Sequence, residues 1–131
     1  MSDNVMELRL VVTAPDYAEA VTFYRDVLGL RERAAYSSED GNVTILEAGQ
    51  ATLEIADPNQ ADYIDRVEVG RRVAGQFRVA LQVTDATGTT RVLTEAGASL
   101  VAAPTRTPWN SLNARLETPG GIQLTLFEEL V

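Results

Sequence analysis

The feature that most constrains the fold of this chain is an internal repeat. In each half, a strand-like apolar run is followed by an Asp that can cap a helix, a helical stripe of apolar residues, and a Gly. Agreement in the order and the spacing of these signals indicates a duplicated structural unit. The matched positions are Arg9 and Arg78, Asp16 and Asp85, Gly29 and Gly97, and Glu54 and Thr125, at offsets of 69, 69, 68 and 71 residues.

The first copy has the element order β, α, β, β, β. The run Leu8 to Thr13 is apolar and β-branched, which predicts a buried strand. Asp16 is typical of a helix N-cap, with Glu19 as its capping-box partner, and Gly29 is typical of the residue that ends such a helix. Three further strands are predicted between turn signals, at Arg31 to Tyr36, Asn42 to Glu47 and Ala51 to Ala56.

The second copy repeats this order after a polar linker. The linker covers residues 58–75, and Pro58 suits the first turn of a short helix over Asn59 to Arg66. Asp85 and Gly97 then bound a second long helix. The strands predicted for this copy are Phe77 to Val83, Ser99 to Ala103, Ser111 to Leu116 and Ile122 to Phe127.

These two copies predict a single α+β domain. A chain of 131 residues suits one compact core rather than two independent enzymatic domains. We expect residues 1–57 to form the first βαβββ unit and residues 76–131 the second, and the two units to curl a mixed sheet around a ligand-binding pocket.

Composition excludes several classes of function. Hydrophobic residues make up 45% of the chain and charged residues 23%, which is ordinary for a globular protein. The chain has no apolar run near the roughly 20 residues of a membrane helix and no signal-peptide pattern, so we expect a cytoplasmic protein. A net charge of −8 with scattered cationic residues argues against nucleic-acid binding. The chain also contains no cysteine and no histidine, so it lacks thiolate and imidazole chemistry.

One segment resembles a family signature. Residues Phe23 to Leu30, with the sequence FYRDVLGL, are similar to the FYxxxLG motif that ends a helix in the vicinal oxygen chelate superfamily of glyoxalases, extradiol dioxygenases and bleomycin-resistance proteins. The duplication and the closing Thr118 to Gly121 turn extend this resemblance over essentially the whole chain. The resemblance implies a homodimer whose pockets form between units of one or of both chains.

The resemblance also bears on metal binding. Metal-using members of the superfamily offer four ligands, usually His or Glu, and the corresponding positions here are Arg9, Glu54, Arg78 and Thr125. Only Glu54 is a suitable ligand for a divalent cation, while the two guanidinium groups remain charged and repel one. We therefore expect neither a metal nor another cofactor.

The remaining pocket residues suit a flat organic ligand. Arg9, Glu54 and Arg78 form either a structural ion network or a polar contact for a ligand oxygen. Trp109, the only tryptophan, precedes a strand that carries Ser111, Asn113 and Arg115 on one face. Aromatic rings with a few polar groups are the usual lining of small-molecule pockets. The predicted ligand-binding residues are Arg9, Tyr36, Glu54, Arg78, Trp109, Ser111, Asn113 and Phe127.

Three functions are compatible with this pocket. The first is a metal-free protein that binds and sequesters an aromatic natural product or antibiotic, as the resemblance to the bleomycin-resistance branch implies. The second is a glyoxalase-like or metal-independent lyase or isomerase, with Glu54 as general base and Arg9 or Arg78 steadying an oxyanion. The third is a structural or regulatory dimer with a vestigial pocket, which a buried Trp109 without an adjoining cavity would favour.

Overall fold

The computed structural model describes residues 10, 12, 14–39, 41–51, 57–75 and 77–131. The helices are α1 (Tyr17–Val21), which continues as the π-helical segment η2 (Thr22–Val27), then α2 (Pro58–Glu68) and α3 (Ala86–Glu95). The strands are β1 (Arg31–Ser38), β2 (Gly41–Glu47), β3 (Val79–Gln82), β4 (Ser99–Arg106), β5 (Ser111–Glu117) and β6 (Gln123–Glu129). The chain therefore has a mixed α+β fold, as the sequence predicts.

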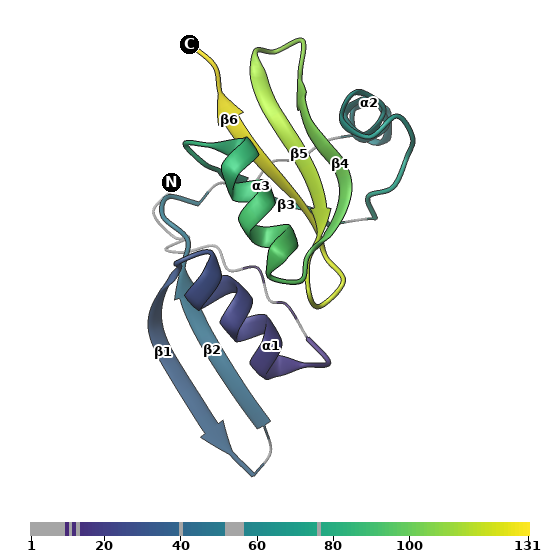
Figure 1. Cartoon of the computed structure of the whole chain (residues 1–131). Helices are drawn as coiled ribbons and strands as arrows, with labels where there is room; N and C mark the ends of the chain where they lie inside the picture. The colour runs from purple at the N-terminus through teal and green to yellow at the C-terminus, as the bar shows by residue number, and fades with distance from the viewer. Residues whose placement is uncertain (1–9, 11, 13, 40, 52–56, 76) are drawn as a thin grey trace, which may run out of the picture.

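The strands of the described residues form two sheets (Figure 1). β1 and β2 make an antiparallel hairpin. The second sheet has the order β3-β6-β5-β4, in which β3 runs parallel to β6 and the other pairs are antiparallel. With α3 between β3 and β4, residues 79–129 show the order β, α, β, β, β that the sequence predicts for the second unit.

Helix α3 covers one face of the four-stranded sheet (Figure 1). This face carries the apolar core, because alternate residues of β5 and β6 point toward the helix. Phe23, from η2, joins the same core, so the first helix is fixed against the second half of the chain. The buried members of this core are Phe23, Leu93, Ala98, Ala114, Leu116, Leu124 and Leu126.

Helix α2 packs on the face of β5 opposite the apolar core, because it contacts Arg115, the neighbour in sequence of the core residue Leu116. It begins at Pro58 after the N-cap Asp57, whose side chain accepts a hydrogen bond from the Gln60 backbone N–H. Ile64, Asp65 and Glu68 are buried, whereas the first turn of the helix is exposed. The C-terminal half of α2 therefore anchors the helix to the sheet.

The predicted helix ends are confirmed. The carboxylates of Asp16 and Asp85 accept hydrogen bonds from the backbone N–H groups of Glu19 and Gly88, each at 3.0 Å. Gly29 has a φ of 82° and follows the first helix directly, in the left-handed region that glycine adopts without steric cost. The linker helix is also confirmed, although it extends two residues beyond the predicted end.

Some predicted elements differ from the structure. The second half of the first helix is wider than an α-helix, with the Leu28 backbone N–H bonded to the Phe23 carbonyl at 2.9 Å. β3 is shorter than the predicted strand from Phe77 to Val83. The predicted strands at 8–13 and 51–56 lie largely outside the described residues, so the duplication remains a prediction. In the described part of the chain, no helix is both long and apolar enough to cross a membrane.

Candidate ligand-binding site

A cavity of about 630 Å³ lies between α2 and the polar face of the four-stranded sheet. This volume falls within the roughly 300–1,000 Å³ that is usual for small-molecule pockets. The sheet contributes Arg78, Ala80, Ser111, Asn113, Thr125 and Phe127 to its lining. The helix contributes Gln60, Ile64 and Glu68. Trp109, Asn110, Glu129 and Leu130 surround the end where β4, β5 and β6 meet solvent.

Beneath this cavity, Arg115 joins α2 to the sheet. Its side chain is fully buried, and a buried guanidinium needs charged partners. Nη1 donates to Asp65 Oδ1 and Nη2 donates to Glu68 Oε1, both at 2.8 Å. Nε donates to Thr125 Oγ1 at 3.1 Å. One arginine thus binds two carboxylates of the helix and one hydroxyl of β6.

Asp65 is held as an anion from two sides. Its Oδ2 accepts the backbone N–H groups of Val73 and Ala74, at 2.8 and 2.9 Å, and a guanidinium N–H of Arg72 at 3.1 Å. Burial acts to raise the pKa of Asp65, but the bonds from Ala74, Val73 and Arg115 outweigh it and lower the pKa from 3.8 to about 2. The same carboxylate therefore fixes both α2 and the segment that follows it.

The surroundings of Thr125 show whether this site could bind the metal that the superfamily resemblance implies. Its hydroxyl accepts N–H groups from Arg78 Nη1 at 2.8 Å and from Arg115 Nε at 3.1 Å, which occupies both oxygen lone pairs. The expected ligand positions Arg78 and Thr125 do lie together, but a guanidinium pair around a saturated hydroxyl does not fit a divalent cation. Within the described residues, no cluster of three or more Asp, Glu, His or Cys side chains could hold a metal ion.

A row of polar side chains continues from Glu68 toward the open end of the cavity. Asn113 Nδ2 donates to Glu68 Oε2 at 2.7 Å, and Asn113 Oδ1 accepts from Ser111 Oγ at 2.6 Å. Ser111 Oγ lies 2.8 Å from Thr107 Oγ1. All four side chains are buried, so their hydrogen bonds act in a low-dielectric environment where each is strengthened.

Two aromatic rings meet at the open end. Trp109 is 44% exposed and Tyr63, on α2, is 39% exposed, with ring centroids 5.9 Å apart and planes tilted by 55°. Asn110 holds the Trp109 turn in place with a φ of 64°, and its Nδ2 donates to the Leu130 carbonyl at 2.7 Å. Trp109 is therefore not a core residue, since it borders a cavity and half-faces solvent.

The structure brings five of the predicted ligand-binding residues into one cavity. They are Arg78, Trp109, Ser111, Asn113 and Phe127. Tyr36 does not line this cavity. It lies on β1 opposite Val43 and is 63% exposed. Arg9 and Glu54 lie outside the described residues, so the network expected between them and Arg78 remains a prediction.

Sequence reasoning missed the carboxylates that organise this site. Asp65 and Glu68 are three residues apart on the segment interpreted as a linker, which places both on one helical face. Arg115 shares the face of Asn113 by strand alternation. These two spacings were the available signals, but nothing local indicates that the two faces meet.

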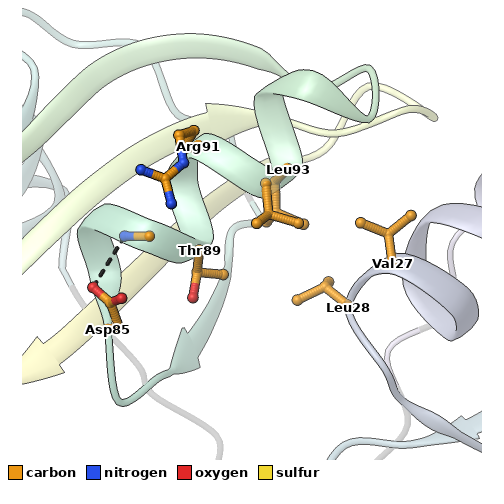
Figure 2. A pocket seen from close by; sticks show the side chains of 8 residues that line it. Val27, Leu28, Asp85, Thr89, Arg91 and Leu93 are labelled. Atoms are coloured by element: carbon orange, nitrogen blue, oxygen red, sulfur yellow. Dashed lines mark hydrogen bonds between the residues drawn. The ribbon is translucent and has the colours of Figure 1, made fainter.

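A second, smaller hollow of about 370 Å³ lies between the end of the first helix and α3. Figure 2 shows Val27 and Leu28 pointing toward Leu93 across it, with Asp85 turned back to cap its own helix. Its lining is a helix contact with polar groups at one edge, and it holds no ring or buried polar network.

Comparison with known proteins identifies the family. The model of the glyoxalase/bleomycin resistance protein/dioxygenase superfamily matches residues 8–126, and the chain belongs to this superfamily. No curated protein matches the chain.

Several solved structures share the fold. A member of the same superfamily from Sphaerobacter thermophilus is 21% identical with a TM-score of 0.59, over 91% of this chain and 92% of the other. A glyoxalase-related enzyme from Fulvimarina pelagi is 14% identical with a TM-score of 0.59, over 95% and 89%. A hypothetical protein from S. aureus is 15% identical with a TM-score of 0.62, over 95% of each chain. At these identities the likeness concerns the fold alone.

Proposed function

We propose that this protein is a metal-independent binding protein that sequesters an aromatic natural product, such as an antibiotic, without changing it. The observation that carries the proposal is Trp109, a half-exposed indole at the open end of a cavity of about 630 Å³. A vestigial pocket loses the observation that would favour it, a buried Trp109 with no cavity beside it.

The lining of the cavity supports a flat ligand. Trp109 and Phe127 provide ring faces, while Ile64 and Ala80 provide apolar walls. A few convergent polar groups among such residues are what fixes the orientation of a small molecule. Ser111 and Asn113 occupy that place here.

The hydrogen bonds of the buried polar residues favour binding of a ligand over its chemical conversion. Glu68 is the buried carboxylate of the cavity lining, and it accepts hydrogen bonds from Arg115, Asn113 and Thr125. Three of its lone pairs are therefore already engaged by protein donors and do not face a ligand. The donor set at Arg78 and Thr125 does not fit a catalytic metal either.

The resemblance also supports a cytoplasmic homodimer built from two βαβββ units per chain. Light scattering coupled to size-exclusion chromatography should give twice the chain mass of 14.2 kDa. A monomeric mass over the micromolar range contradicts the dimer and leaves the ligand proposal to its own test.

The ligand proposal is tested by titrating the protein with aromatic antibiotics and polyketide quinones while Trp109 emission is recorded. We expect quenching with at least one compound, recovered with its mass unchanged. Because Trp109→Ala removes the signal, that variant is compared by equilibrium dialysis, and its affinity should fall about tenfold or more, as expected for a central aromatic contact. No binding by any compound contradicts the proposal. A changed ligand mass favours the lyase or isomerase alternative, which Glu54→Gln then tests.

A further inference from the structure

The sheet face beneath the cavity is covered unevenly. Helix α2 packs on β5, where Asn113 and Arg115 are buried. Thr125 of β6 pairs with Arg115 on one side and with Ala80 of β3 on the other, so these three residues share one face of the sheet. On β3, however, Ala80 and Gln82 are exposed. The helix therefore does not cover this face of β3, and the cavity lies over Ala80.

Ala80 forms the bottom of a recess on this open face. Its four neighbours on the face all have side chains larger than a methyl group. They are Arg78 and Gln82 along β3, and Thr125 and Phe127 on β6. The methyl group of Ala80 therefore lies lower than the atoms around it. Of the two exposed residues of β3, Ala80 lines the cavity and Gln82 does not, so the cavity extends down to this methyl group.

The distance from this recess to the open end of the cavity favours an elongated ligand. Ala80 pairs with Thr125 of β6. Glu129 lies four residues further along that strand, at the end of the cavity that Trp109 borders. Four residue steps along a strand correspond to about 13 Å, which is longer than a single six-membered ring. Phe127 lies between the two ends and is half-buried, so its ring can contact the middle of such a ligand.

We infer that the cavity selects fused aromatic ring systems over single rings, and that Ala80 is the residue that sets this size limit. The inner ring of the ligand occupies the recess over the Ala80 methyl group, and the outer end of the ligand lies beside Trp109. This inference rests on the proposed function and specifies the class of ligand that the cavity binds.

Three probes test the size limit with a constant polar group. Acetophenone, 2-acetylnaphthalene and 2-acetylanthracene carry the same acetyl group on one ring, on two fused rings and on three fused rings. Affinities are measured by equilibrium dialysis against the full chain. We expect the affinity to rise about tenfold or more from the first probe to the third, because each added ring buries further apolar surface.

Ala80→Leu assigns the size limit to the recess. It should lower the affinity for 2-acetylanthracene about tenfold or more, because the added side-chain atoms occupy the space of the inner ring. The affinity for the smallest probe that the original chain binds should be unchanged, which shows that the cavity is intact.

Gln82→Leu is the matched control. It places the same side chain two residues along β3, on the same face but outside the cavity lining, and it should bind all three probes like the original chain. Because both positions are exposed, urea denaturation should give the original midpoint for both variants.

The outcomes distinguish the two proposals. An equal loss for all three probes in Ala80→Leu, or no loss for any of them, overturns the size limit at Ala80 and leaves the aromatic binding function standing. Equal affinity of the original chain for the smallest and the largest probe overturns the selection of fused rings. A loss in Gln82→Leu as large as that in Ala80→Leu contradicts a specific role for Ala80. Absence of binding of all three probes to the original chain overturns the binding function itself.

Discussion

Strands β5 and β6 carry buried side chains on both faces of the sheet, but different interactions stabilise the two faces. On the α3 face, Leu116, Leu124 and Leu126 are fully buried in an apolar core. On the α2 face, Arg115 and Thr125 of the same two strands are equally buried in a hydrogen-bonded ion network. One residue step along each strand separates the two environments.

The two faces should lose stability differently when a buried side chain is substituted. An apolar core loses stability in proportion to the volume removed, and its neighbours relax into part of the space. A buried network is satisfied only as a whole, because removing one charge leaves its partner unpaired in a low dielectric. The α3 face should therefore tolerate graded substitution, whereas the α2 face should not.

The largest effect is expected from Arg115→Met. This change removes the cation that pairs with Asp65 and Glu68, and unpaired buried charge costs about 3–5 kcal/mol. We expect that loss in the free energy of unfolding, measured by urea denaturation. Arg91→Met, at an exposed arginine, is the control and should change stability by less than about 0.5 kcal/mol.

A triple variant sharpens this test. Combining Arg115→Met with Asp65→Leu and Glu68→Met removes all three buried charges together, and such exchanges are often neutral or stabilising. We expect most of the lost stability to return. Ligand binding should nevertheless be weaker than in the original chain, because Asn113 has lost its acceptor Glu68. A triple variant no more stable than Arg115→Met would mean that the network is not the reason for the loss.

On the apolar face, Leu126→Ala should cost about 3 kcal/mol, since deletion of a fully buried leucine side chain leaves a cavity. Leu126→Met, which nearly conserves volume, should cost less than about 1.5 kcal/mol. Both values come from the same denaturation measurement. If Leu126→Met lowers the free energy of unfolding as much as Leu126→Ala, the loss does not follow the volume removed. The contrast between the two faces would then be wrong.

The same contrast explains which features the sequence could predict. Asp16, Asp85 and Gly29 were recognised because a cap involves only residues within one turn of it. The strands of the second half were predicted, with β3 too long, because alternation and turn signals are also local. These features depend on nothing outside their own segment.

The ion network depends on where two distant segments meet. Arg115 contacts Asp65 and Glu68, which are 50 and 47 residues away in the chain. The sequence offers other carboxylates as partners, and only the docking of α2 on β5 selects between them. For the same reason Tyr36 was predicted as a ring of the site, whereas the ring that contacts Trp109 is Tyr63.

Acid should weaken the α2 face selectively. The pKa of Asp65 is lowered by folding from 3.8 to about 2, so the folded state favours the carboxylate. Its contribution, about 2 kcal/mol, is present above pH of about 4 and is lost as the pH falls toward 2. Denaturation at successive pH values should show this slope, and Asp65→Asn should flatten it. An unchanged slope in Asp65→Asn would assign the acid sensitivity to other carboxylates.

The smallest effect is expected at the open end of the cavity, where Tyr63 and Trp109 are partly exposed to solvent. Tyr63→Ala removes the ring contact with Trp109, and such a contact stabilises the fold by about 1 kcal/mol. The effect is small because both rings are partly exposed. Since Trp109 is the only tryptophan, its emission should shift to longer wavelength and acrylamide should quench it more strongly. Tyr36→Ala, at an exposed ring on β1, is the control and should leave Trp109 emission unchanged. Equal emission from both variants would show that α2 does not cover Trp109 in solution, and the N-terminal half of that helix would then not form a wall of the cavity.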